Sequence, residues 1–404
     1  MSAATQPALH PGPFAGVRVL DFTNMMSGPY CTRLLADLGA EVIKVEPPEG
    51  DHNRSRRPVR NGYSSFFGQL NAGKKCIVLN LKSAVGVATA KALAQKCDIV
   101  VENWRPGVAD RLGVGYKALS EGRSDLIYCS ISGFGQTGPK SLRPAYAPMV
   151  HAASGFDHAQ MGYQKADQPA NTATFTGDLF GGISAFSAVQ AAYIQRLRTG
   201  RGQYLDVSLF DGMLNILVYE VQEAQAPTDE KVRVYQPLKT IDGHIVLAPT
   251  SQKNFELLAR SVGHPEWIED PRFSRTRARE AHWGELMDLI GEWTKVRTGL
   301  ECEDHLLADG VPCSRYMTVA EAIADPQVVY RGSMTKVVDP AGSYLIPNAP
   351  FAMPGTDAAP KPHIPQLGEH GQEILGGLLG YGPSQIKQCA VRASTRPTAE
   401  ETES

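Results

Sequence analysis

The sequence predicts an α/β fold in which helices cover an open parallel sheet, followed by a smaller α+β domain. Strand and helix signals alternate through the first half of the chain, and the composition changes near residue 226. The length of 404 residues leaves room for roughly two or three domains. We therefore expect one large domain built from strand-helix-strand units and one separate, smaller domain.

The first strand-helix-strand unit lies near the N-terminus. The apolar run Val17–Phe22 predicts a strand, and Glu41–Glu46 alternates as a second one. Between them, Pro29 opens a predicted helix that runs through Leu38, and Gly39 ends it. Two strands joined by one helix predict a parallel pair with a right-handed crossover.

The alternation continues through the large domain. Further strands are expected at Cys76–Asn80, Ile99–Glu102 and Leu126–Ile131, and further helices at Val85–Lys96, Asp178–Leu197 and Leu209–Ala224. Tyr204–Val207 is interpreted as an extended link between the last two helices. Strands that alternate with helices in this way predict a parallel sheet with helices on its faces.

The second domain is expected to begin near Ala226-Pro227-Thr228-Asp229. Two short strands, Tyr235–Thr240 and Ile245–Ala248, flank the turn signal Asp242-Gly243 and predict a hairpin. Helices are expected near Asn254–Ser261, Trp283–Val296 and Glu301–Leu307. The expected boundaries are 14–225 for the large domain, 226–330 for the small domain, 331–392 for a segment that returns to the large domain, and 393–404 for a polar, disordered tail.

The composition argues against several classes of function. A net charge of −2 provides no basic field for nucleic acid, and no apolar run approaches the ~20 residues of a membrane span. Residues 1–12 lack the basic and apolar regions of a signal peptide. The seven scattered cysteines form no Cys-x-x-Cys pair, which is typical of free thiols in a reducing compartment. These features predict a cytoplasmic protein that binds neither nucleic acid nor a membrane.

Metal and serine-nucleophile motifs are missing from the sequence. The ten histidines form no His-x-x-x-His pair, no cysteine-histidine group has ligand spacing, and no Gly-x-Ser-x-Gly occurs. We therefore expect no metal site. A cysteine nucleophile stays open, although no cysteine is distinguished by its neighbours.

Residues 133–138 fit the dinucleotide pattern Gly-x-Gly-x-x-Gly and follow a predicted strand. Pro139 comes directly after the third glycine, and no amphipathic helix starts there to bind a pyrophosphate. A tight loop at the carboxyl end of the sheet is the better interpretation. Loops at this edge commonly line active sites in α/β folds.

Basic residues gather in the predicted loops of the large domain. They are Arg54, Arg56, Arg57, Arg60, Lys74, Lys75, Arg105 and Arg111. A solvated surface explains each of them alone. Together, close to predicted strand ends, they are also consistent with a site for a small polyanion, because arginine binds phosphate through a bidentate fork.

Asp178 allows two interpretations. It stands at the start of a predicted helix, where aspartate is a favoured cap. It is also a carboxylate with a reference pKa of about 3.9, so it is ionised without a base and can attack a thioester to form an acyl anhydride. The helix dipole would keep it charged, and backbone N–H groups near Gly181 and Gly182 could stabilise an oxyanion. Spacing alone favours the cap.

Several segments between Gly16 and about Leu379 together resemble a known family. They are Gly16–Phe22, Gly28-Pro29, Leu38–Glu46, Asn71 with Lys74 and Lys75, Val101–Gly107, Gly133–Gly135, Gly177-Asp178, Thr199–Gln203, Gly310–Cys313 and Leu367–His370. The chain resembles the family III CoA-transferases, the group that includes formyl-CoA:oxalate and carnitine CoA-transferases. The resemblance implies a Rossmann-like large domain, a small domain, and a homodimer whose two chains interlock as rings.

The resemblance also implies roles for individual residues. Asp178 matches the nucleophilic aspartate of the family. The positions that match contacts to CoA are Met26, Ser27, Arg54, Asn71, Lys74, Lys75, Asn103, Trp104, Arg105 and Arg111. Those near the acyl group and the acid are Tyr146, Gly133, Phe134 and Gly135. CoA and acyl-CoA are then substrates, no cofactor is permanently bound, and the second substrate is a free carboxylic acid. The arginines in 54–60 and Lys165 are consistent with a dicarboxylate, and contacts to CoA phosphates or to solvent explain them equally well.

The chain departs from the family pattern at two places. One relative has an arginine on the adenine side where this chain has Pro48, so that contact is lost or is supplied by Arg54. The glycine-rich substrate loop of the formyl-CoA enzyme has no counterpart, because Tyr235–Thr250 is short and contains only Gly243. The second departure argues against oxalate as the acceptor.

The same fold hosts 2-methylacyl-CoA racemases, which pair the aspartate with a histidine. At the matching position this chain has Tyr146, while His151 and His158 come later. Tyrosine, with a pKa of about 10, is a poor partner for proton exchange near neutral pH. The sequence therefore favours CoA transfer through an anhydride and a thioester at Asp178, with racemisation as the alternative.

Overall fold

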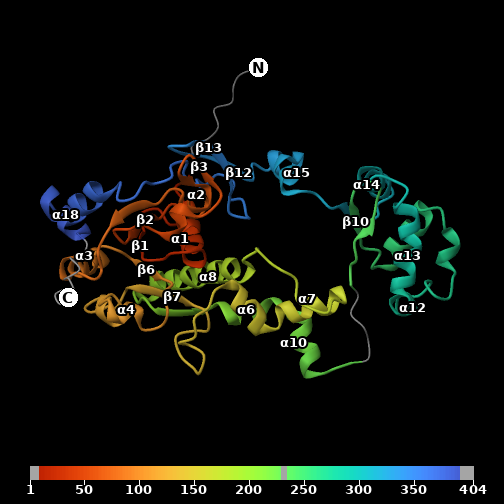
Figure 1. Ribbon diagram of the computed structural model, residues 1–404, viewed down its shortest axis with the longest axis horizontal. Helices are drawn as coiled ribbons and strands as arrows, with labels where there is room; N and C mark the ends of the chain where they lie inside the picture. The colour runs from red at the N-terminus through yellow and green to blue at the C-terminus, as the bar shows by residue number, and fades with distance from the viewer. Residues whose placement is uncertain (1–8, 229–233, 392–404) are drawn as a thin grey trace, which may run out of the picture. The chain divides into compact units, whose positions relative to one another are not determined.

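The computed structural model describes residues 9–228 and 234–391 (Figure 1). The chain divides into two compact units, Met1–Val221 together with Arg331–Ser404, and Gln222–Tyr330. The segment after residue 330 thus belongs to the same unit as the N-terminal part. The predicted tail 393–404 lies outside the described residues.

A parallel sheet of six strands forms the centre of the first unit. Its strands are β1 (Arg18–Asp21), β2 (Glu41–Glu46), β5 (Lys75–Val78), β6 (Ile99–Glu102), β7 (Ile127–Ser132) and β8 (Tyr204–Ser208). They lie in the order β5-β2-β1-β6-β7-β8, and all neighbouring pairs are parallel. Counted along the chain, this is the 3-2-1-4-5-6 order of a doubly wound sheet. The predicted α/β fold with a parallel central sheet is confirmed.

The helices of this unit surround the sheet. They are α1 (Ser27–Asp37), α2 (Ser65–Asn71), α3 (Ala84–Ala94), α4 (Val108–Arg111), α5 (Tyr116–Leu119), α6 (Ala147–Ser154), α7 (Phe156–Gln164), α8 (Thr176–Thr199), α9 (Leu209–Ile216), α10 (Val218–Gln225, which runs into the second unit), α17 (Gly377–Leu379) and α18 (Pro383–Ala390). The short elements are η1 (His52–Ser55), η3 (Gln372–Gly376), and the hairpins β3 (Val59–Arg60) with β4 (Tyr63–Ser64) and β12 (Met334–Asp339) with β13 (Gly342–Pro347).

Both faces of the sheet are buried, because successive side chains of a strand point to opposite sides. Val19 packs in the core that contains α1 and α8. Its neighbour Leu20 packs in the core that contains α3 and α18. Figure 1 shows the C-terminal helix α18 beside α3, and the Thr89 hydroxyl lies 3.3 Å from the Cys389 sulfur. The N-terminal part of the chain and the segment that contains α18 therefore pack together in one unit.

Two segments differ from the sequence prediction. The expected link at Tyr204–Val207 is the sixth strand, β8, which pairs with β7 at the edge of the sheet. It is short and only half-buried at Tyr204 and Leu205, so it lacks the apolar run that marks the inner strands. The single helix expected at Leu209–Ala224 is broken at Leu217 into α9 and α10.

The second unit has its own small core. Its antiparallel sheet has the order β11-β10-β9, and α11 and α13 pack in the same core. The elements are β9 (Leu238–Lys239), β10 (His244–Leu247), α11 (Gln252–Ser261), η2 (Pro265–Ile268), α12 (Thr276–Ala281), α13 (Trp283–Thr294), α14 (Gly299–Ala308), β11 (Cys313–Arg315), α15 (Val319–Ala324) and α16 (Pro326–Tyr330). The hairpin turns at Asp242-Gly243 as expected, and Asp242 also accepts the backbone N–H of Gly299 at 2.7 Å.

Candidate active site

A cleft of about 380 Å³ opens at the carboxyl ends of β1, β6 and β7. The strand order reverses between β1 and β6, and ligands of doubly wound sheets bind at such a switch point. The residues that line the cleft are Asn24, Met25, Ser27, His52, Asn103, Trp104, Arg105, Pro106, Val108, Arg111, Ile131, Ser132, Gly133, Ser141, Arg143, Pro144, Ala145, Tyr146, Asp178 and Leu209. Most of the predicted site residues are therefore brought together.

Asp178 lies in the cleft at the start of α8 but does not cap the helix. The helix begins at Thr176, its cap position is Phe175, and the Phe175 side chain makes no capping hydrogen bond. Asp178 is thus a residue of the first turn, and its carboxylate accepts the backbone N–H of Ala147, the first residue of α6. The carboxylate stands where two helices begin, and the N-terminus of each carries partial positive charge.

Burial changes the ionisation of this carboxylate. It raises the pKa of Asp178 to about 6, against the opposing effects of the Ala147 N–H and the positive charge of Arg56. The carboxylate is therefore less well solvated than an ordinary aspartate yet still ionised at neutral pH. A carboxylate of this kind is suited to attack on a carbonyl group.

His151 performs the capping that Asp178 does not. Its Nε2 atom accepts the backbone N–H of Gly177 at 2.9 Å, which satisfies one of the open donors of α8. His151 is buried, and burial lowers its pKa, so the ring is neutral and carries its proton on Nδ1. The Nε2 atom is thus occupied in a structural hydrogen bond.

Gly181 and Gly182 serve helix packing and not an oxyanion site. A Cβ atom at Gly181 would lie 2.1 Å from Cδ2 of Leu209, and one at Gly182 would lie 2.6 Å from the Ser27 carbonyl oxygen. Both residues lie beyond the first turn of α8, where the N–H groups are bonded inside the helix. The predicted oxyanion role for these two residues is therefore wrong, because their backbone donors are already used.

The glycine-rich loop after β7 holds a carboxylate of the protein itself. The Gln136 N–H donates to both carboxylate oxygens of Asp206 at 3.1 and 2.9 Å, and no helix begins between residues 133 and 146. Gly133 lies in the cleft, where a Cβ atom would be 2.3 Å from that of Ala145. Phe134 packs against Phe210, with ring centroids 5.6 Å apart. The loop shapes the cleft wall and offers no dinucleotide site.

The residues predicted to contact CoA form one side of the cleft. Asn103 exchanges two hydrogen bonds with the backbone of Asn24, at 2.9 and 2.8 Å, and so connects β6 to the turn before α1. Trp104 packs against Phe22, with centroids 5.6 Å apart. Ser27 is the first residue of α1, while Met26 is buried at the cap position and does not line the cleft.

The cleft also carries positive charge. Three arginines line it, namely Arg105, Arg111 and Arg143, and all are exposed. Their guanidinium groups form no ion pair with any residue in 9–228 or 234–391. Asp178 is the one carboxylate in the described lining, so the cleft is suited to an anionic ligand.

Besides Met26, four residues predicted to contact CoA are not brought into the cleft, namely Arg54, Asn71, Lys74 and Lys75. Lys74 is buried, and its Nζ atom lies within 3.0 Å of oxygens of Asp21, Pro29, Thr32 and Asn71. Lys75 is the first residue of β5, so it lies at the amino ends of the parallel strands, whereas the cleft lies at their carboxyl ends. It forms ion pairs with Glu41 and Glu373 at 2.6 and 2.7 Å. The ammonium groups of both lysines are occupied in the protein, and Asn71 is occupied by Lys74.

Arg54 is occupied in the same way. It forms an ion pair with Glu46 at 2.6 Å and lies 4.0 Å from the Phe67 ring centroid. A second cavity of about 610 Å³ adjoins the cleft, and both share Asn24, His52 and Trp104. Pro48 lines this cavity and Arg54 does not. As the side chains are arranged here, Arg54 therefore does not supply the contact to the adenine side of CoA that is lost at Pro48.

Sequence reasoning did not single out several residues of the cleft, among them Met25, His52 and Arg143. Arg143 stands three residues before Tyr146 in one loop, which was a usable signal. Met25 has a positive φ of 61°, unusual for a residue with a side chain, and its carbonyl accepts the side-chain N–H of Asn53. No sequence pattern marks that conformation.

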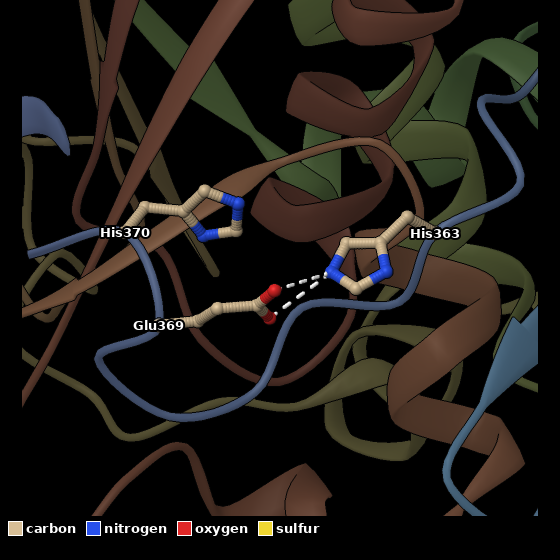
Figure 2. A group of neighbouring side chains, drawn as sticks. All are labelled: His363, Glu369 and His370. Atoms are coloured by element: carbon tan, nitrogen blue, oxygen red, sulfur yellow. Dashed lines mark hydrogen bonds and ion pairs between the residues drawn. The ribbon is translucent and has the colours of Figure 1, made fainter.

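Three side chains that offer metal ligands, His363, Glu369 and His370, converge in the loop after β13 (Figure 2). His363 Nε2 lies 2.8 and 3.0 Å from the two Glu369 oxygens, and Gln366 N–H donates to Glu369 at 2.6 Å. His370 Nδ1 accepts the backbone N–H of Cys76 at 3.2 Å. The His370 hydrogen bond fastens the loop to β5, and the bonds to Glu369 hold the loop itself together. Because these bonds account for the cluster, we assign no metal to it.

Within the described part of the chain, no helix is both long and apolar enough to cross a membrane.

The comparison with known proteins identifies the family. The model of CoA-transferase family III matches residues 14–371. The chain belongs to CoA-transferase family III. Family III CoA-transferases use CoA thioesters as substrates, and this enzyme shares the predicted family segments along nearly its whole length.

Individual relatives of this family III CoA-transferase agree. The acetyl-CoA:oxalate CoA-transferase of Acetobacter aceti is 35% identical over 92% of this chain and 97% of its own length. The human succinyl-CoA:glutarate CoA-transferase is 32% identical over 93% of this chain and 88% of its own length. A CaiB/BaiF family protein from Brucella suis, a solved structure, has a TM-score of 0.79 at 31% identity and covers 91% of this chain and 100% of its own. The racemase alternative is not favoured, since the relatives from Acetobacter aceti and from human are both named as CoA-transferases.

Proposed function

We propose that this CoA-transferase moves CoA from an acyl-CoA to a free carboxylic acid through covalent intermediates on Asp178. The observation that carries the proposal is the position of the Asp178 carboxylate. It lines the cleft, is partly desolvated, and lies at the start of two helices. Of the described residues that line the cleft, it is the one carboxylate able to act as a nucleophile.

The reaction proceeds by four exchanges. An Asp178 carboxylate oxygen attacks the thioester carbonyl of the donor, the C–S bond breaks, and an anhydride and CoA thiolate result. The thiolate attacks the Asp178 carboxyl carbon, releases the donor acid, and forms an aspartyl-CoA thioester. The acceptor carboxylate then attacks that carbon and releases the thiolate. Attack of the thiolate on the acceptor acyl carbon gives the new acyl-CoA and regenerates the Asp178 carboxylate.

CoA must stay bound between these steps, so that each return of the thiolate is effectively intramolecular. The two adjoining cavities suit an elongated ligand. We assign the thioester to the cleft beside Asp178 and the adenosine part to the cavity of about 610 Å³, with Trp104 between them. The exposed Arg105 and Arg111 are the proposed phosphate contacts. Ser27 and Asn103 support the turn that faces the ligand.

The neighbours of Asp178 support acyl transfer over racemisation. Racemisation needs a second acid-base group opposite the aspartate. Tyr146 lines the cleft, and Nε2 of His151 is occupied by the Gly177 N–H. His158 lies exposed on α7. We accordingly assign Tyr146, together with Gly133, Phe134 and Gly135, to the acyl and acid side of the site.

Asp178→Asn tests the nucleophile. The amide cannot form the anhydride, so CoA exchange between acids should fall by more than about a thousandfold, while CoA binding persists. With wild-type enzyme and an acyl-CoA, mass spectrometry of the digested protein should find CoA attached to the Asp178 peptide. Turnover by Asp178→Asn near the wild-type rate would contradict the proposal.

A matched control is available in α9. Asp211 also occupies the third position of a helix, after the cap Ser208, but it is exposed and does not line the cleft. Asp211→Asn should leave activity unchanged. Racemisation is tested separately, by incubating a chiral 2-methylacyl-CoA in deuterated water without free acid. Rapid α-deuteration there would support the alternative reaction.

A further inference from the structure

Arg56 is a half-buried cation without an anionic partner. Its guanidinium carbon lies 4.4 Å from the centroid of the Phe66 ring and 4.9 Å from that of Phe175. It forms no ion pair with any residue in the described part of the chain. Two arginines of the same region are neutralised, Arg54 by Glu46 at 2.6 Å and Arg60 by Asp339 at 2.9 Å. Arg56 thus differs from Arg54 and Arg60 by its lack of a carboxylate partner, and from the exposed Arg57 by its partial burial against two rings.

The surroundings of Arg56 hold the side chain in place without using its donors. Phe66 belongs to α2 and Phe175 is the cap residue of α8, so two separate elements contribute the rings. Aromatic rings attract a guanidinium through their negative faces but accept no strong hydrogen bond. The N–H donors of Arg56 therefore remain available to a ligand. A partly buried charge without a partner is costly, which favours binding of an anion there.

Arg56 lies on the side of the nucleophile. Phe175 directly precedes α8, and Asp178 lies in the first turn of that helix. The charge of Arg56 also acts on the Asp178 carboxylate and lowers its pKa against the larger effect of burial. The two groups form no ion pair with each other within 4.0 Å. Arg56 is not among the residues that line the cleft, and its contact with Phe175 places it beside the first turn of α8, which carries Asp178.

Building on the proposed function, we propose that Arg56 selects dicarboxylic acids by binding the carboxylate that does not react. One carboxyl group of the substrate, free or as its CoA thioester, meets Asp178. The other binds the planar fork of Arg56, which matches a carboxylate in two parallel hydrogen bonds. Arg56 is thereby a specificity-determining residue. A monocarboxylic acid of the same length leaves the fork empty and gains nothing from it.

The test compares two acids on one enzyme sample, because a ratio cancels any difference in the folded fraction. With a common acyl-CoA donor, kcat/KM is measured for succinate against butyrate, and for glutarate against pentanoate. Arg56→Met keeps an apolar side chain between the two rings and removes the charge. It should lower kcat/KM for each dicarboxylate by at least about tenfold and change the monocarboxylates by less than about threefold.

Two further variants sharpen the result. Arg56→Lys retains the charge without the fork, so its preference for dicarboxylates should fall between those of wild type and Arg56→Met. Arg57→Met removes the adjacent exposed arginine and should leave the preference unchanged. An equal loss for both classes of acid in Arg56→Met would assign Arg56 a structural role and overturn the inference. So would a wild-type enzyme that does not prefer dicarboxylates.

Failure of the underlying mechanism has a different signature. If the proposed function is wrong, Asp178→Asn transfers CoA at a normal rate to every acid, or the wild type transfers it to none. If only the role of Arg56 is wrong, the Asp178 peptide still acquires CoA and the ratio between acids does not respond to Arg56→Met.

Discussion

At the scale of single residues, the site depends on how a few charged groups are solvated. Asp178 keeps its charge although burial opposes it, because the Ala147 N–H and the Arg56 charge stabilise the anion. His151, one turn into α6, is held neutral by burial. Glu102, buried at the end of β6, has a pKa raised by burial to about 7. Of the described residues that line the cleft, Asp178 is the one carboxylate, and it is ionised at neutral pH, whereas the buried Glu102 outside the lining is only partly ionised there.

The pKa of Asp178 predicts the pH dependence of the reaction. Only the ionised carboxylate attacks, and its pKa is about 6. On the acid side kcat/KM should therefore fall about tenfold per pH unit below pH 6 and level off above it. Arg56→Met should shift this limb to higher pH, since Arg56 lowers the pKa of Asp178. Glu102→Gln should leave the limb in place. A flat profile between pH 5 and pH 7 would contradict the assignment.

Two neighbouring lysines should behave differently when they are replaced. Lys74→Met leaves the buried carboxylate of Asp21 without its closest cation and should destabilise the fold by about 3 kcal/mol or more. Lys75→Met breaks partly exposed ion pairs and should cost less than about 1 kcal/mol. Urea unfolding measures both. If Lys75→Met folds well but has a higher KM for acyl-CoA, the result would instead support the sequence-based prediction that Lys75 contacts a CoA phosphate.

At the scale of elements, the Asp178 carboxylate, the proposed nucleophile, is positioned by the packing of α6 and α8. His151 from α6 binds the Gly177 N–H of α8, and Asp178 of α8 binds the Ala147 N–H of α6. Each helix thus satisfies a donor at the N-terminus of the other. Gly182 lets α8 approach α1 at the Ser27 carbonyl. The proposed nucleophile is therefore held by the N-termini of two packed helices and not by a loop.

His151→Ala tests this reciprocal arrangement. The change leaves the buried Gly177 N–H without an acceptor, which should cost about 1–3 kcal/mol of unfolding free energy. Because Asp178 is the next residue, kcat should fall more than KM rises. His158→Ala on α7, an exposed histidine, should change stability by less than about 0.5 kcal/mol. Equal effects of the two substitutions on urea unfolding and on kcat would contradict the role given to His151.

At the scale of the whole molecule, the chain forms two compact units with separate cores. The first unit contains every predicted site residue. The family resemblance implies that two such chains interlock as rings, and we retain this homodimer and the cytoplasmic location as proposals. Interlocked chains cannot separate without unfolding, whereas an ordinary dimer exchanges its subunits.

Subunit exchange provides the measurement. Light scattering during gel filtration should give twice the chain mass of 43.7 kDa. Tagged and untagged dimers mixed under native conditions should form no mixed species over days, while co-expression should yield them. Rapid exchange without unfolding would exclude interlocked rings, and a monomer at micromolar concentration would exclude the dimer.

The regular elements of the sheet were predictable from the sequence. Glu41–Glu46 and Ile99–Glu102 have the bounds expected for them, because buried parallel strands are continuous apolar or alternating runs between turn signals. The edge strand β8 was missed since its half-buried residues lack that signal. The family and the candidate nucleophile were also predictable from the sequence, because several separate segments resemble those of family III CoA-transferases.

The sequence by itself determined the α/β class and the family, and it singled out Asp178 as the candidate nucleophile, since each follows from local patterns or from matched segments. Only the tertiary structure decided what surrounds that carboxylate. It turned the expected cap into a first-turn residue, gave the capping to His151, and placed Lys74 in the interior. It also left Arg56 between two rings without a partner. The physical reason is that solvation, charge pairing and helix packing depend on residues brought together from distant parts of the chain, which spacing along the sequence does not record.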